Sequence, residues 1–180
     1  MSSFDSELST AEESTETIIL VQSSLISSIS NTLNILINNN INQDNYSKVV
    51  LLQSHSPFSA SQVPPISIEA YLERIFSYSK CEESSLISSL IYIDRLSSIG
   101  NVLITPYNIH RIIFASVLIA IKYNEDRIFK MKYYASIAGV SEKELLFLES
   151  AFLRAIKFNL YIEEKEYEDY SNCLLIEDKS

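Results

Sequence analysis

Apolar residues in this chain recur every three or four positions, the spacing of a helix face that packs on other helices. The first such run spans 17–37, where serines and asparagines fill the opposite, polar face. No stretch alternates apolar and polar residues as a half-buried strand would. The pattern therefore predicts an all-α fold. The apolar positions of the first run are Ile18, Val21, Leu25, Ile29, Leu33 and Leu36.

Five further helices are predicted in the middle of the chain, and most have a local signal at one end. Ser67 is a good N-cap, and Thr105-Pro106 combines an N-cap residue with proline at the first helical position. Gly139 is a typical helix stop, while Ser141 and Glu144 have the spacing of a capping box. The predicted helices cover 67–79, 84–97, 106–124, 131–138 and 141–158.

The third of these helices is apolar on nearly every side from Ile112 onward, which is typical of a helix in the middle of a bundle. A last segment, 163–175, forms an amphipathic helix through Tyr167, Tyr170 and Leu174, with an acidic face that we expect to be solvated. We expect a disordered acidic N-terminus at 1–16, a helical extension with a proline-containing linker at 17–65, the five-helix unit at 66–160, and an acidic C-terminal helix and tail at 161–180.

Charge changes this picture by arguing against a nucleic-acid binder. The chain of 180 residues carries a net charge of −9. Residues 66–163 hold eleven acids and eleven bases, so the excess acid lies at the two ends. A nucleic-acid binder would show a basic face.

The apolar run 112–121 is too short to cross a membrane, and the acidic N-terminus is unlike a targeting signal. We expect a soluble intracellular protein, in the nucleus, the cytoplasm or both.

Candidate chemistry is sparse, and we expect no enzyme, cofactor or metal site. There is no glycine-rich phosphate loop and no nucleophile with a nearby histidine in the sequence. Cys81 and Cys173 are far apart and lack metal-ligand spacing, so reduced thiols are expected. His110 is expected to be a packing or capping histidine. Ser56-Pro57, in the linker, is a candidate proline-directed phosphorylation site, although such dipeptides are common.

Two charged residues interrupt apolar faces and therefore need partners. Lys122 ends the apolar run of the third helix, and Glu149 interrupts the apolar stripe of the fifth. A charge on a packing face is costly unless it is paired. The two can serve each other, another group in the chain, or a partner protein, and the pattern leaves these alternatives open.

The order and spacing of several short motifs resemble the cyclin box of P/U-type cyclins, the class of the fungal phosphate-pathway cyclins. The motifs are Pro-Ile-Ser-Ile-Glu-Ala-Tyr-Leu-Glu-Arg-Ile at 65–75; Tyr92-Ile93-Asp94-Arg95; Asn108-Ile109-His110-Arg111 with Ala120-Ile121-Lys122; Tyr133-Tyr134-Ala135 with Gly139; and Glu144-Leu145 with Leu148-Glu149 and Phe152-Leu153.

The resemblance implies a cyclin box of five helices and a non-catalytic, activating subunit of a cyclin-dependent kinase. The box would bind the kinase αC helix region in a heterodimer, with no nucleic acid, membrane or metal. On this reading Lys122 and Glu149 hold the kinase and brace each other. The other kinase-binding residues are expected to be Tyr123, Phe129, Tyr133, Tyr134 and Phe152.

Further expectations follow from the resemblance. Arg74 and Asp94 are expected to form a structural pair that orients the first two helices of the box. The chain has no tryptophan, so substrate docking of the mitotic-cyclin type is not expected. We expect a single cyclin box. A transcription-factor-like protein of the same fold and a scaffold that does not activate a kinase remain alternatives. The N-terminal helix either contacts the kinase or packs on the box.

Overall fold

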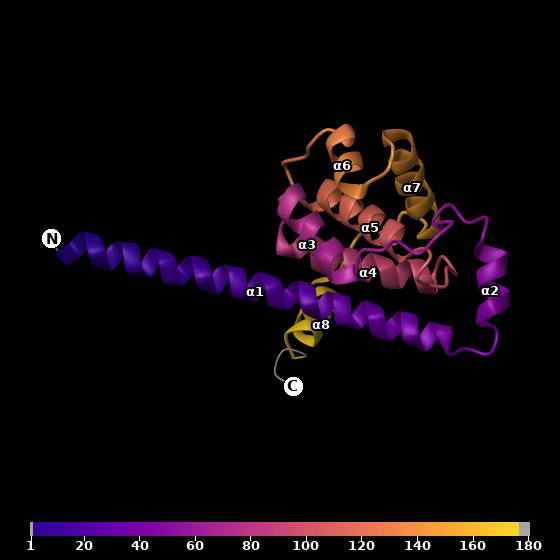
Figure 1. The fold of residues 1–180 in the computed structure, drawn as a ribbon, viewed down its shortest axis with the longest axis horizontal. Helices are drawn as coiled ribbons and strands as arrows, with labels where there is room; N and C mark the ends of the chain where they lie inside the picture. Colours follow the sequence, from indigo (N-terminus) through magenta and orange to yellow (C-terminus); the bar gives the residue numbers. More distant parts are fainter. Residues whose placement is uncertain (1, 177–180) are drawn as a thin grey trace.

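The structure, a computed structural model, describes residues 2–176, and within this range every regular element is a helix. The side chains of residues 2–19, Val21 and 175–176 lie outside the described part. The predicted all-α fold is confirmed. The helices are α1 (Ser2–Ile41), α2 (Tyr46–Gln53), α3 (Ile68–Ser79), α4 (Glu83–Ser98), α5 (Ile109–Asn124), α6 (Met131–Ala138), α7 (Glu142–Ala155) and α8 (Glu164–Ile176), as Figure 1 shows.

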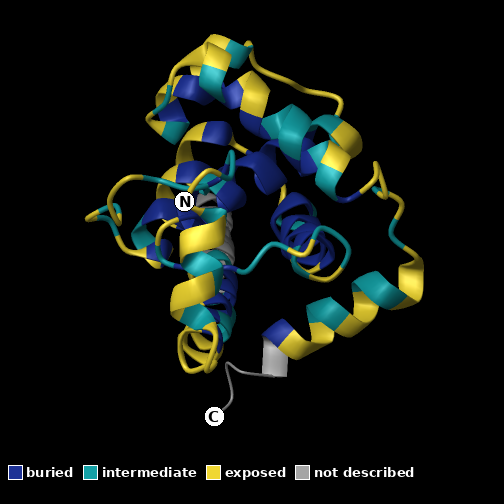
Figure 2. Ribbon diagram, turned by 90° about the vertical axis from the view of Figure 1, so that its right-hand side faces the viewer, coloured by how far each residue is buried: buried dark blue, intermediate teal, exposed yellow. Residues whose placement is uncertain are grey.

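Helix α5 is the centre of the box formed by α3 to α7. Every residue from Ile112 to Ile121 is buried, and α5 contacts α3, α4, α6 and α7. Figure 2 shows buried residues gathered between the helices and exposed residues on their outer faces. A helix that is apolar all round is stable only where neighbours cover all its sides. The predicted buried third helix is therefore confirmed.

Local capping fixes the ends of several box helices. The Ser67 hydroxyl accepts a hydrogen bond from the Ala70 N–H at 3.2 Å, so α3 begins where the sequence predicts. Helix α6 ends at Gly139, whose φ of 75° lies in the left-handed region that glycine adopts readily. The Ser141 hydroxyl caps α7 by accepting from the Glu144 N–H at 3.2 Å.

The third box helix begins later than predicted, at Ile109 instead of Pro106. The Asn108 N–H donates to the Thr105 carbonyl at 3.1 Å, and the Asn108 amide oxygen accepts from the Thr105 N–H at 2.8 Å. These bonds close a turn before the helix starts. The fifth helix of the box, α7, also ends earlier than predicted. Lys157 and Phe158 have φ values of 55° and 56°, which lie in the left-handed region and do not continue an α-helix.

Helix α1 packs on the box through its C-terminal half and contacts α3 and α8. Asn40 fastens its end, since the side-chain amide donates to the buried Ile104 carbonyl at 2.9 Å. This favours packing on the box over kinase contact for this half, whose buried side chains are Leu25, Ile26, Ile29, Leu33 and Ile37.

The rest of α1 extends away from the box and begins at Ser2, well before the predicted start at Thr17 (Figure 1). The predicted disorder of residues 1–16 concerns residues whose side chains lie outside the described part.

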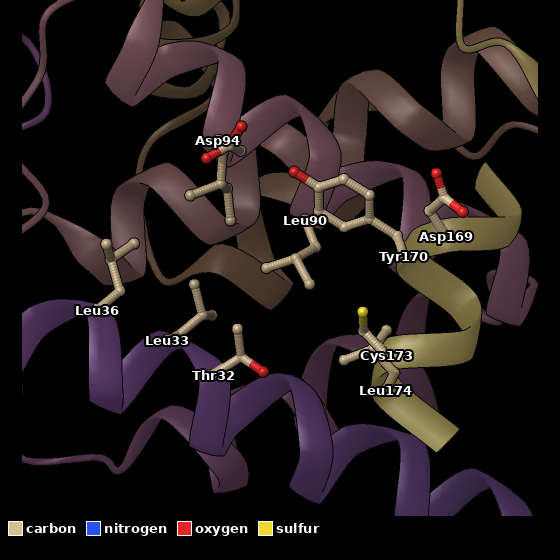
Figure 3. A pocket seen from close by; sticks show the side chains of 10 residues that line it. Thr32, Leu33, Leu36, Leu90, Asp94, Asp169, Tyr170, Cys173 and Leu174 are labelled. Carbon is tan, nitrogen blue, oxygen red and sulfur yellow. The ribbon is translucent and has the colours of Figure 1, made fainter. Parts of the chain in front are cut away.

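Helix α8 lies against α1 and α4. Arg95 of α4 holds it in place, because its guanidinium bonds the Glu166 carboxylate at 2.6 Å and the Asn159 carbonyl at 2.8 Å. An apolar groove of about 360 Å³ remains where α1, α4 and α8 meet, and Figure 3 shows Leu33, Leu90 and Tyr170 facing it. The amphipathic character predicted for the segment 163–175, which forms α8, is thus confirmed.

Candidate partner-binding site

Lys122 and Glu149 meet in an ion pair between the last turn of α5 and the middle of α7. The Lys122 Nζ lies 2.7 Å from Oε1 and 2.9 Å from Oε2 of Glu149, so the ammonium bonds both carboxylate oxygens. The side chains are 30% and 14% exposed. A cation in the last turn also interacts favourably with the unpaired carbonyls of the helix end. The two misplaced charges therefore serve each other, and the pair still reaches the surface.

Exposed aromatic side chains lie close to this pair along the chain. Tyr123 follows Lys122 directly and is 52% exposed. Phe129 and Tyr133 are 47% and 39% exposed, and their ring centroids are 4.9 Å apart. The Tyr133 hydroxyl donates to the Tyr78 carbonyl at 2.9 Å, which fixes its ring on the outside of α6. These three residues are placed where a partner can reach them.

Two other predicted contact residues belong to the core. Tyr134 is 1% exposed, and its hydroxyl oxygen accepts a hydrogen bond from the Phe129 N–H at 3.3 Å. Burial raises the pKa of Tyr134. Phe152 is fully buried and packs edge-on against Phe58, with centroids 6.0 Å apart. Because neither side chain reaches the surface, the prediction that they contact a partner is corrected.

Arg74 and Asp94 are not brought together. The Arg74 guanidinium donates to the Ser136 carbonyl of α6 at 3.1 Å, and no ion pair among the described residues joins it to Asp94. Asp94 lies instead beside Tyr170 of α8, where burial and the nearby carboxylate raise the pKa of the tyrosine to about 12. The predicted pair fails because the two side chains point toward different neighbouring helices.

Sequence reasoning missed three exposed apolar residues on α7 and in the α5–α6 loop. Leu146 and Phe147 of α7 are 45% and 54% exposed, and Ile128 of the α5–α6 loop is 50% exposed. Leu146 precedes Glu149 by three positions, so both lie on the same face of α7.

We call the ion pair and the exposed apolar residues carried by α5, α6, α7 and the α5–α6 loop the α5–α7 surface. Helices α6 and α7, which carry four of its eight members, lie on the side of the box away from α1 and α8 (Figure 1). The packed half of α1 therefore leaves this surface open. Its members are Lys122, Tyr123, Ile128, Phe129, Tyr133, Leu146, Phe147 and Glu149.

The buried histidine has a packing role, as predicted. The Nε2 atom of His110 lies 2.9 Å from the Ile66 carbonyl oxygen, and the ring packs against Tyr71 at 5.1 Å between centroids. Burial lowers the pKa of His110, which keeps the ring neutral.

The two cysteines are free thiols. Cys173 is exposed, while Cys81 is buried, and burial raises its pKa to about 11. Among the residues whose side chains the structure describes, no group of three or more His, Cys, Asp or Glu is arranged to hold a metal ion. In this described part, every helix is too short or too polar to cross a membrane.

The sequence model of the Cyclin family matches residues 12–160. The chain belongs to the cyclin family.

Among curated proteins the chain is similar to P/U-type cyclins. It is 38% identical to Cyclin-U4-2 of Arabidopsis thaliana over 120 residues, which is 66% of this chain and 56% of that protein. It is 32% identical to Cyclin-P3-1 of Oryza sativa subsp. japonica over 136 residues, 76% of this chain and 57% of that protein. It is 38% identical to the PHO85 cyclin-like protein psl1 of Schizosaccharomyces pombe over 120 residues, 66% of this chain and 49% of that protein.

This cyclin thus covers about half to three-fifths of the length of these relatives. The similarity supports a P/U-type cyclin with a regulatory role, and α3 to α7 are its cyclin box.

Proposed function

We propose that this cyclin is the activating subunit of a cyclin-dependent serine/threonine kinase, and that the α5–α7 surface binds the αC helix region of the kinase. The observation that carries the proposal is the Lys122–Glu149 pair, which is already formed and still partly exposed. Exposed apolar side chains lie near it in the chain, on α5, on α7 and in the loop after α5.

The pair has spare hydrogen-bonding capacity that suits a partner's backbone. An ammonium group has three donors, and Lys122 uses two of them on Glu149. The carboxylate likewise keeps lone pairs that can accept backbone N–H groups. Charge-assisted bonds of this kind are stronger than neutral ones, and they gain strength when water is excluded. The exposed Leu146, one turn before Glu149 on the same face of α7, provides apolar area that excludes water beside the pair.

Activation follows if this cyclin binds the active kinase conformation better than the inactive one. In an active kinase, the αC glutamate pairs with the β3 lysine, and the DFG aspartate holds magnesium. A subunit shifts this equilibrium only by its difference in affinity for the two conformations. A rigid box that holds αC in its inward position supplies that difference without taking part in the chemistry.

The relatives support a kinase partner. Cyclins are regulatory subunits, and the name of the fission-yeast relative associates it with PHO85. We propose an intracellular location for the complex, in the nucleus, the cytoplasm or both.

The test is reconstitution of the purified chain with candidate cyclin-dependent kinases and measurement of peptide phosphorylation. We expect activation by the wild type, and for Lys122→Ala or Glu149→Ala a loss of kinase affinity of tenfold or more, about 1.4 kcal/mol or above. Lys165→Ala is the matched control, because Lys165 pairs with Asp169 at 3.3 Å on the exposed side of α8.

Kinase binding without activation would instead support the scaffold function. No binding to any cyclin-dependent kinase would reject the proposal.

A further inference from the structure

The described chain has two Ser/Thr-Pro dipeptides, and they differ in how far they are exposed. Thr105, before Pro106, is 3% exposed, and its backbone N–H and C=O both bond Asn108. Ser56, before Pro57, lies half-buried in the connector between α2 and α3, directly after the exposed Ser54 and His55. Only the second dipeptide is at a surface that a modifying enzyme can reach by lifting a short loop.

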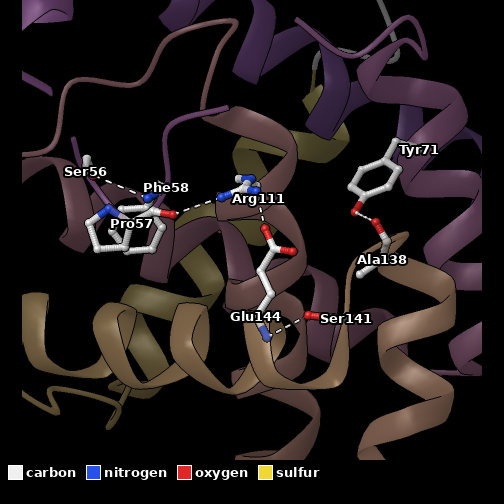
Figure 4. Close-up of polar contacts among 8 residues, drawn as sticks. All are labelled: Ser56, Pro57, Phe58, Tyr71, Arg111, Ala138, Ser141 and Glu144. Atoms are coloured by element: carbon white, nitrogen blue, oxygen red, sulfur yellow. Dashed lines mark hydrogen bonds and ion pairs between the residues drawn. The ribbon is translucent and has the colours of Figure 1, made fainter. Parts of the chain in front are cut away.

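We call residues 54–60 the strap. It is fastened to the box by Arg111 of α5 and by its own buried Phe58, and Figure 4 shows the bond from Arg111 to the Pro57 carbonyl. The Ser56 hydroxyl accepts from the Phe58 N–H at 3.4 Å, and Arg111 of α5 donates to the Pro57 carbonyl at 3.1 Å. Phe58 is 3% exposed, so it anchors the strap. A guanidinium group is therefore held one residue away from the Ser56 hydroxyl.

Arg111 has a second partner on α7. Its other terminal nitrogen pairs with the Glu144 carboxylate, and both side chains are about one-third exposed. This contact uses the side chain that a complete capping box would turn back to the Ser141 N–H. Only the Ser141 half of the predicted capping box is present, since the Ser141 hydroxyl does accept from the Glu144 N–H. Arg111 thus joins the strap to the first turn of α7.

We propose that Ser56 is phosphorylated by a proline-directed serine/threonine kinase, and that the phosphate takes Arg111 from Glu144. In the reaction, the Ser56 oxygen bonds the γ-phosphorus of ATP while the bond from that phosphorus to the bridging oxygen of ADP breaks. The hydroxyl proton passes to the kinase's base and then to water. The strap must lift at Phe58 for the dipeptide to enter the kinase, and it returns to the box afterwards.

Electrostatics favours the exchange. A phosphate carries about −1.5 to −2 charges at pH 7 and three strong acceptor oxygens, against one charge on a carboxylate. Guanidinium groups bind phosphate in a bidentate geometry. Glu144 is then repelled by the phosphate and is free to complete the capping box, where a carboxylate is also favoured by the helix dipole. This change of partner by Arg111 links the strap to α7, the helix that carries Glu149.

The first experiment treats the full chain with ATP and a purified proline-directed kinase, of the cyclin-dependent or mitogen-activated class, and locates phosphate by mass spectrometry. We expect phosphate on Ser56, none there in Ser56→Ala, and most of it lost in Pro57→Ala. Ser54→Ala and Ser59→Ala are matched controls, because these serines lie in the same strap without a following proline. The site is rejected if the wild type takes up no phosphate, or if Ser56→Ala takes up as much as the wild type.

The second experiment tests the role of Arg111 by ³¹P NMR titration of the phosphorylated chain. A nearby cation lowers the second phosphate pKa below its usual value of about 6, and we expect a shift of about one unit. Arg111→Gln should return the pKa to its usual value, while Glu144→Gln should lower it further by removing a competing anion. Equal phosphate pKa values in wild type and Arg111→Gln would overturn the pairing. Neither experiment depends on whether this cyclin activates a kinase, so this inference and the proposed function fail separately.

Discussion

The docking of α1 on the box can be tested with two substitutions on the same helix. Leu33 is 1% exposed and lines the groove with Leu90 and Leu174, whereas Ile35, two positions later, is 55% exposed. Truncating a buried leucine to alanine costs roughly 2–5 kcal/mol, depending on how well the site can relax. Because Leu33 borders a groove of about 360 Å³ that water can enter, we expect the lower part, about 2–3 kcal/mol.

The assay is urea unfolding followed by circular dichroism, with thermal unfolding as a second measure. A loss of about 2–3 kcal/mol lowers the melting temperature by about 4–12 °C in a chain of this size. Ile35→Ala removes a similar volume of side chain from the solvent face and should change stability by about 0.5 kcal/mol or less. If the two variants are equally stable, α1 does not pack on the box as the structure has it.

Three further predictions concern single side chains. Burial holds the folded-state pKa of His110 below its unfolded value, so the unfolded state binds more protons and the unfolding free energy should fall as the pH drops through and below about 6.5. His110→Gln should reduce this slope in urea midpoints between pH 7.5 and 5.5, and the exposed His55→Gln should not; equal slopes would reject the assignment. Gly139→Ala should lower the unfolding free energy by about 1 kcal/mol, because a Cβ there meets no atom within 4 Å and only the φ of 75° is unfavourable; an unchanged urea midpoint would contradict this. A thiol reagent should label the exposed Cys173 quickly and the buried Cys81 only on unfolding, as followed by mass spectrometry; rapid labelling of both would show that the core around α4 is open.

Local signals in the sequence predicted much of the fold. Ser67 and Gly139 set the ends of α3 and α6 through contacts within a few residues, and such contacts are visible in the chain itself. The start of α5 could not be read in the same way. Thr105-Pro106 is a common helix start, but the Asn108 side chain bonds back to the Thr105 N–H and forms a turn first.

The candidate site was predicted only where burial pattern alone decides. The burial pattern predicted that Lys122 and Glu149 each need a partner and left the partner open, and the structure shows that they pair with each other. Tyr133 and Tyr134 show the limit of such reasoning. Neighbouring residues on a helix point about 100° apart, so one ring lies on the surface and the other in the core. Which one is exposed depends on the rotation of α6 against its neighbours.

The prediction that Arg74 pairs with Asp94 was wrong for the same reason. Arg74 lies on a helix that faces α6, where it finds the Ser136 carbonyl. An ion pair requires two side chains that point at each other, and the spacing of residues along a helix does not by itself give that direction. Arg95, the neighbour of Asp94, forms the structural ion pair instead, with Glu166 of α8.

The most direct test of the central claim exchanges the two charges in the double variant Lys122→Glu with Glu149→Lys. The exchange keeps an internal ion pair and reverses the charges that the α5–α7 surface presents. Stability is measured by urea unfolding, and activation by phosphorylation of a peptide with the cognate cyclin-dependent kinase. If the kinase binds this pair, the double variant should keep stability near that of the wild type and lose kinase activation tenfold or more, about 1.4 kcal/mol or above. Full activation by the double variant would contradict the account and leave the pair with a structural role alone.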